Sequence, residues 1–438
     1  MNRIVALFIV FLLLVACVPT PDEEAVLNRT DGALEQAITE PPVTPYVYEA
    51  PARWEETYTV RKREIRFEAD VEVPTAEQFP VETVKQYRIA GGDVVSFLEK
   101  LCPGDWDIRE NELSREELTE DLKHAANMYL GEDDDTGEPV YGPNEEEMQR
   151  IQKQIEQAPL EDSYIPLSTV LQFPVTNTPV KNSSGETWYL SAQSKETRSS
   201  VRLARHRDSS VQTEQAVMQV GSAPYRPDGL KNVKISREDA IRVCEETLSA
   251  LGFAGFRAAD ADKAIEAQSY SLAELSEWYL VHAVFALEGT VPCCYAQASS
   301  QNFIQTGDDP DAAFAPPWQQ EFLELYVTEE GVQQIWWSQP KEHVLVANEN
   351  VKLMPFEAFR QSFQKLIEFG TGDYADSPLI VKRLVLTTAI AQIPNQGDEA
   401  FLIPAWAIFL TTEDDQAAHI APHVLLINAI DGSTIRVQ

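Results

Sequence analysis

The chain has 438 residues and carries 35 basic against 70 acidic side chains, a net charge of −35. A surface this acidic repels nucleic acid and anionic lipid headgroups, which excludes nucleic acid as a partner. The length exceeds what one compact domain usually takes, so two domains are expected.

The first seventeen residues predict export. Residues 1–16 hold one basic residue, Arg3, and then an unbroken apolar run, which is typical of a signal peptide. The run is shorter than the about 20 residues that cross a bilayer. Leu14-Val-Ala-Cys17 resembles the lipobox of bacterial lipoproteins. The resemblance implies a lipid such as palmitate on Cys17, which anchors the chain on the extracytoplasmic face of the cell membrane. The alternative is an ordinary secretion signal with a chance cysteine.

Composition divides the rest of the chain into three parts. Residues 17–50 are rich in prolines and acids and show no period, which predicts a disordered tether. Residues 51–225 and 226–438 each predict a domain, with a proline- and glycine-bearing boundary at 223–229. We expect an α+β fold of two domains, each with helices packed on a mainly antiparallel sheet.

In the N-terminal domain, alternating apolar residues such as Ile65 and Phe67 predict a half-buried strand within 58–73. Ser114 and Asn144 are typical first residues of helices. Between those helices lies the acidic loop 131–137, whose spacing fits no EF-hand frame. The other expected elements are a helix at 93–101 and strands at 188–192 and 200–204.

The C-terminal domain begins with a helix that Ser236 caps and Gly252 ends. A tight turn at 328–331 predicts a hairpin. The other expected elements are strands at 278–287, 322–327, 332–337, 379–390, 401–410, 423–430 and 434–437 and a helix at 356–370.

A short motif in this domain resembles a known pattern. Pro404-Ala-Trp406 on one expected strand, followed by Ile427-Asn-Ala-Ile-Asp-Gly432 at a late one, is similar to the ending of PepSY and YycH/YycI-type extracytoplasmic regulatory proteins. Uncharacterised lipoproteins of Gram-positive bacteria share this ending. The resemblance implies a PepSY/YycI-like α+β domain with a regulatory role. YycH and YycI carry a transmembrane helix where this chain has a lipobox.

The residues of that motif are explained by the demands of a fold. Gly432 after Asp431 supplies the positive φ angle of a tight hairpin. Asn428 suits a hydrogen bond to neighbouring backbone, and Trp406 suits a core. We therefore interpret the motif as structural rather than catalytic: Pro404, Trp406, Asn428, Asp431 and Gly432.

The search for chemistry gives no catalytic site. The chain has no serine-nucleophile, phosphate-loop, dinucleotide or zinc-protease motif. His419 and His423 beside the acids at 413–415 are the best metal candidates, but Pro422 prevents one regular helix, so no metal or cofactor is predicted. Four cysteines remain besides Cys17, and disulfides or free thiols are both open for them: Cys102, Cys244, Cys293 and Cys294.

Aromatic side chains gather in one stretch and could line a surface for a sugar or a peptide: Trp318, Tyr326, Trp336 and Trp337. Because Trp336 and Trp337 are adjacent on an expected strand, they should face opposite sides.

These observations favour a non-catalytic, lipid-anchored interaction or regulatory module whose partner is another extracytoplasmic protein or peptide. The alternative is a lipoprotein that binds a solute or a cell-wall fragment, and a third hypothesis is a hydrolase with an unrecognised site. A shallow exposed apolar patch would favour the first hypothesis, and a deep polar cleft between the halves would favour the second.

Overall fold

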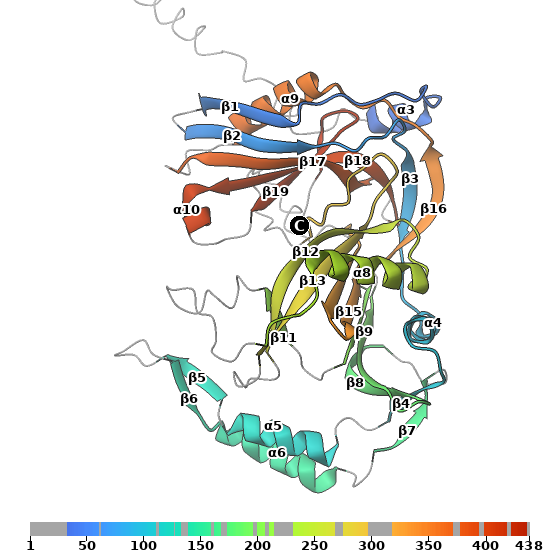
Figure 1. Ribbon diagram of the computed structural model, residues 1–438, viewed down its shortest axis with the longest axis vertical. Coiled ribbons are helices and arrows are strands. Elements are labelled where there is room, and N and C mark those ends of the chain that lie inside the picture. The colour runs from blue at the N-terminus through green and yellow to red at the C-terminus, as the bar shows by residue number, and fades with distance from the viewer. Residues whose placement is uncertain are drawn as a thin grey trace, which may run out of the picture.

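The computed structural model has two large sheets, of which sheet A lies above sheet B in Figure 1, and a small two-stranded sheet. No helix of the described residues is long and apolar enough to cross a membrane. The structure describes residues 33–60, 63–110, 114–126, 128–132, 139–158, 162–167, 173–195, 199–205, 210–213, 231–267, 275–296, 318–370, 377–393, 398–417 and 422–435.

Sheet A is antiparallel except where β2 runs parallel to β17. One of its faces is covered by α9 (Phe356–Gly370), whose Phe359 and Phe363 are buried. The short α10 (Glu413–Ala417) follows β18. Its described strands are β1 (Arg53–Val60), β2 (Arg63–Glu72), β3 (Val81–Gln86), β16 (Lys341–Asn348), β17 (Leu379–Gln392), β18 (Glu399–Thr412), β19 (His423–Asn428) and β20 (Thr434–Ile435).

Sheet B is antiparallel, and its apolar face packs on α4 (Gly91–Leu101) and α8 (Arg237–Leu251). Ser236 caps α8 by accepting a hydrogen bond from the Asp239 amide. In spatial order its described strands are β11 (Ser210–Thr213), β12 (Phe256–Ala267), β13 (Leu275–Phe285), β14 (Phe322–Thr328), β15 (Gly331–Ser338), β10 (Ser199–Ala204), β9 (Thr187–Ser194), β8 (Val175–Asn182), β4 (Trp106–Arg109) and β7 (Tyr164–Pro166).

A helix pair extends from sheet B at the bottom of Figure 1. It consists of α5 (Arg115–Ala125) and α6 (Glu145–Gln157), with the two-stranded sheet of β5 (Met128–Glu132) and β6 (Pro139–Gly142) between them in sequence. Leu118 and Ile151 are buried between the helices. The acidic loop that could not be fitted to an EF-hand lies largely outside the described residues.

The expected α+β class with mainly antiparallel sheets is confirmed, but the expected division at 226 is wrong. β2 of the first half pairs with β17 of the second, and β10 pairs with β15 along Val201↔Trp337. Each half therefore contributes strands to both sheets. The local proline- and glycine-bearing run at 223–229, which suggested the boundary, lies outside the described residues. Such a run cannot reveal which distant strands pair.

The expected tether is corrected over its second half. Residues 33–39 form the helix α3 (Ala33–Thr39), in which Leu34 and Ile38 are buried. These residues are four apart, so they share one helical face and anchor α3 to the core of sheet A. The side-chain amide of Asn348, at the end of β16, donates to the carbonyl of Ile38 at 2.9 Å. Residues 1–32, including the predicted signal peptide and Cys17, lie outside the described part of the chain.

Candidate functional site

The four aromatic residues expected to line one surface do not come together. Trp318 and Tyr326 are buried in separate apolar clusters, at 6% exposure each. Trp336 and Trp337 are half-buried and lie on opposite faces of β15, as adjacent strand residues should. Trp337 packs against Phe253 on the helix-covered face. These four residues therefore do not form a shared stacking surface.

Trp336 belongs to a row of side chains that crosses the other face of sheet B. Register places Arg202, Trp336 and Glu324 opposite one another on β10, β15 and β14. The row continues through His282 on β13 to Asp260 on β12. Directly opposed residues of an antiparallel sheet share a face, so polar residues far apart in sequence meet here.

His282 is held between two carboxylates of that row. Its Nδ1 lies 2.6 Å from Asp260 Oδ1, and its Nε2 lies 3.5 Å from Glu324 Oε1. Burial by itself lowers the pKa of this imidazole, but the bonds and charges of Asp260 and Glu324 outweigh it and raise the pKa to about 9. His282 is therefore a cation at neutral pH, and the row neutralises its own charges.

This arrangement predicts a pH dependence of stability. The pKa of His282 is higher in the folded chain than its ordinary value of 6.5 in an unfolded chain, so protonation favours folding. The stabilisation is complete below about pH 6.5 and is lost as the pH rises through about 9, with a total of about 3 kcal/mol. We expect the unfolding free energy of the parent to fall over this range relative to a His282→Gln variant in urea titrations. Parallel pH curves for the two proteins would contradict the assignment.

A second buried polar cluster lies where the chain passes from sheet B to sheet A. Glu321 precedes β14, and Lys341 begins β16; both are buried. The Trp337 indole N–H donates to Glu321 at 2.8 Å, and the Lys341 ammonium donates to the Gln339 carbonyl at 2.7 Å. Burial raises the pKa of Glu321 to about 7 and lowers the pKa of Lys341 to about 8, and the attraction between the two charges opposes both shifts.

The residues of the C-terminal motif all serve the backbone or the core. The Gly432 φ angle is +77°, and its amide donates to the Asn428 carbonyl at 2.9 Å. Asp431 Oδ1 accepts from the Ser433 amide at 2.9 Å. The Asn428 side chain accepts from the Ile430 amide at 2.9 Å, and the Pro404 carbonyl accepts from the Ala429 amide at 3.1 Å.

Trp406, the remaining motif residue, is fully buried beneath α9. Its ring stacks on Phe359 with centroids 5.0 Å apart and meets the Phe356 ring edge-on at 5.6 Å. Tyr48, from the segment expected to be a tether, lies 6.1 Å away, centroid to centroid. The tryptophan therefore joins the sheet, the helix and the N-terminal segment.

The four described cysteines are free thiols: Cys102, Cys244, Cys293 and Cys294. Burial raises the pKa of Cys244 and of Cys293 to about 12, so both are protonated at neutral pH and poor nucleophiles. Burial also raises the pKa of Cys102, to about 11, and a hydrogen bond to Glu186 contributes.

Within the described ranges, no group of three or more histidine, cysteine or acidic side chains is arranged to hold a metal ion. Of the candidate pair, His419 lies outside those ranges, and the Nε2 atom of His423 is 3.7 Å from Asp415 Oδ2.

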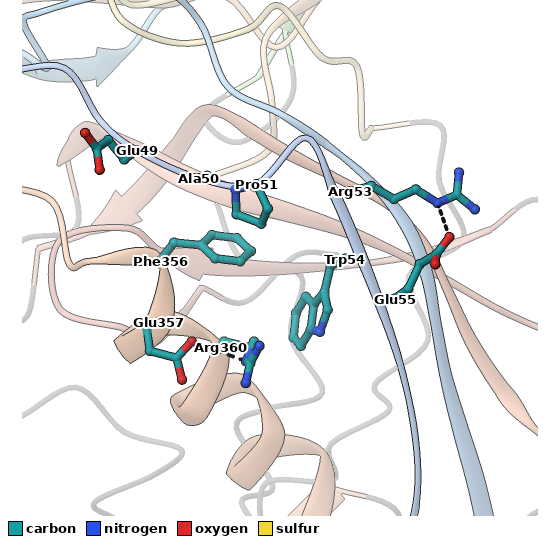
Figure 2. Close-up of a pocket in the computed structure, with 9 residues that line it drawn as sticks. All are labelled: Glu49, Ala50, Pro51, Arg53, Trp54, Glu55, Phe356, Glu357 and Arg360. Atoms are coloured by element: carbon teal, nitrogen blue, oxygen red, sulfur yellow. Dashed lines mark hydrogen bonds and ion pairs between the residues drawn. The ribbon is translucent and has the colours of Figure 1, made fainter.

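Figure 2 shows a groove of about 570 Å³ between the start of β1 and the first turns of α9. Trp54 and Phe356 line it with charged side chains around them. Four of those charges lie in pairs: Arg53 Nε lies 2.6 Å from Glu55, and Arg360 Nε lies 3.5 Å from Glu357. Glu49 is the fifth charged residue of the lining, so the groove carries a net charge of about −1.

The clearest exposed apolar feature is on β16, at the outer right of sheet A in Figure 1. Val344, Leu345 and Val346 are 41%, 56% and 53% exposed. Three consecutive apolar residues are recognisable in the sequence, but such a run predicts a buried strand. Only the sheet order shows that this strand is at an edge.

No family model matches the chain, and no curated protein matches it. A crystal structure of an uncharacterized protein from Eubacterium rectale is similar over 94% of this chain and 100% of that chain, with 10% sequence identity and a TM-score of 0.41. The likeness to PepSY and YycH/YycI-type proteins stays a prediction.

Proposed function

We propose that this protein is a lipid-anchored, extracytoplasmic and non-catalytic interaction module that binds another protein or a peptide. The observation that carries the proposal is the exposed apolar row Val344–Val346 on β16. Soluble proteins seldom leave adjacent large apolar side chains in water unless something binds there. The lipobox at Leu14–Cys17 and the PepSY-like ending support the same proposal, because both resemble extracytoplasmic proteins with binding or regulatory roles.

His282 and the described thiols fit a structural role better than a catalytic one. The imidazole of His282 is enclosed by two carboxylates, and the described thiols are protonated at neutral pH. A general base or nucleophile works best when its pKa lies near the working pH and its lone pair can reach a substrate. A cationic His282 has no lone pair to offer.

The second candidate is a lipoprotein that binds a solute or a cell-wall fragment. Its support is the groove in Figure 2, whose volume of about 570 Å³ is in the usual range for small-molecule sites. Four of its five charged residues pair with one another, so the exposed edge of β16 is the stronger observation.

The anchoring part of the proposal predicts the behaviour of a Cys17→Ala variant. Without the thiol no thioether to lipid can form, so the variant should leave the membrane fraction or stay unprocessed. The parent should show a lipid-bearing N-terminal cysteine by mass spectrometry. Cys102→Ala is the matched control, since it removes a thiol from the folded part of the chain, and it should stay in the membrane. A Cys17→Ala protein that is still cleaved and membrane-bound would rule the anchor out.

A further inference from the structure

We propose that the free edge of β16 binds an extended segment of another protein, rich in lysine or arginine, by adding it as a further strand of sheet A. The inference rests on the proposed function and names the surface, the mode and the class of partner.

The position of β16 supplies the backbone groups for such binding. The strand pairs with β3 from Lys341↔Gln86 to Asn348↔Val81, and among the described strands it has no second neighbour. Every other N–H and C=O along an edge strand points away from the sheet. An incoming extended chain can pair with those groups, which is a common way for proteins to bind peptides.

The side chains of this edge differ from those that usually protect one. Natural edges carry charges, above all lysine, to prevent pairing with other chains. The opposite edge of sheet A follows that rule, since β1 exposes Arg53 and Glu55. On β16 the lysine, Lys341, is 7% exposed, and the middle of the strand carries Val344–Val346 instead.

Charge selects the partner. Glu342 and Glu349 are exposed on either side of the apolar row. The whole chain carries a net charge of −35, so two copies that approach edge to edge repel each other. A segment in which apolar residues alternate with lysine or arginine can pack on the apolar row and also pair with the acidic side chains beside it.

The extent of the surface is limited at one end. The side-chain amide of Asn348, at the end of β16, donates to the carbonyls of Ile38 and Glu40 at 2.9 and 3.0 Å. The helix α3 and the residues after it therefore cover that end of the strand. The free edge comprises the residues from Glu342 to Ala347, a length that suits a short peptide.

The test uses the full chain in non-ionic detergent and labelled eight-residue peptides, with binding followed by fluorescence anisotropy. The first peptide alternates valine with lysine, the second alternates valine with glutamate, and the third is the first with alternate backbone amides methylated. We expect only the first to bind, more weakly in high salt. Leu345→Lys should weaken binding by about tenfold or more, because it removes apolar contact and adds a like charge. Val47→Lys, which adds the same charge at a residue 60% exposed outside any strand, should leave it unchanged.

Each of the other possible results of this experiment contradicts a specific part of the proposal. If the valine–lysine peptide does not bind, or if the glutamate peptide binds equally, the basic partner is wrong. If the methylated peptide binds as well as its parent, strand addition is wrong, although an interaction surface remains. If sedimentation shows dimers of the parent that Leu345→Lys dissociates, the occupant is a second copy. Failure of the lipid anchor would show separately, in the Cys17→Ala fractionation.

Discussion

Trp406→Ala is expected to lower the free energy of unfolding by about 3–5 kcal/mol, the usual cost of truncating a large buried aromatic side chain. The side chain is fully buried and touches two other parts of the fold, α9 through Phe359 and Phe356 and the N-terminal segment through Tyr48. Because the helix and the segment are separate elements, they cannot easily close the space that the indole leaves.

Urea titration followed by circular dichroism measures this loss. Trp406→Phe keeps a ring against Phe359 and should retain much of the stability. Trp336→Ala is a second control, since that tryptophan is half-buried against Phe322 and should cost less. If Trp406→Ala unfolds like the parent while a measured activity disappears, the structural interpretation of the motif is wrong.

Lys341→Met should lower the free energy of unfolding at pH 8 by about 1–3 kcal/mol, because the attraction of Lys341 is the largest influence that offsets the burial of the Glu321 carboxylate. The attraction of Lys341 lowers the pKa of Glu321, so its removal raises that pKa further above about 7. The folded pKa of Glu321 is then far above its ordinary value of 4.5 in an unfolded chain, and the folded state loses stability as the pH rises between these two values. The variant should be much less stable than the parent at pH 8, and closer to it at pH 5.

A double variant measures the interaction between the Lys341 and Glu321 charges. Glu321→Gln with Lys341→Met removes both charges and keeps an acceptor for the Trp337 indole, so most of the lost stability should return. If the double variant is as unstable as Lys341→Met alone, packing rather than charge explains the cost.

Local patterns predicted much of the secondary structure. Ile65 and Phe67 are buried on β2 as their alternation indicates, and Ser236 and Gly252 cap α8 as expected. The hairpin of β14 and β15 is also confirmed. The sequence pattern predicts a single strand where the structure has the hairpin of β1 and β2. The turn gives no signal because residues 61–62 are neither glycine, asparagine nor proline.

Long-range pairing was not predictable from those patterns. The alternation that marks β2 as a strand does not indicate that β17, about three hundred residues later, is its parallel neighbour. For the same reason the row from Arg202 to Asp260 was invisible, since its five members come from five strands that become adjacent only in the folded sheet. The edge position of β16 depends on the same information, and so the apolar row was not selected as a site.

The helix α3 limits how far the proposed binding edge can lie from the proposed lipid anchor. It is the first described element, and it is fastened to the end of β16 through Asn348. The chain from Cys17 to Ala33 spans at most about 55 Å even when fully extended. If Cys17 carries the proposed lipid, a partner held in the same membrane stays within a thin layer that includes this edge, so its local concentration there is higher than in free solution. Strand pairing of only moderate affinity for a free peptide would then bind much more completely between two membrane-bound proteins.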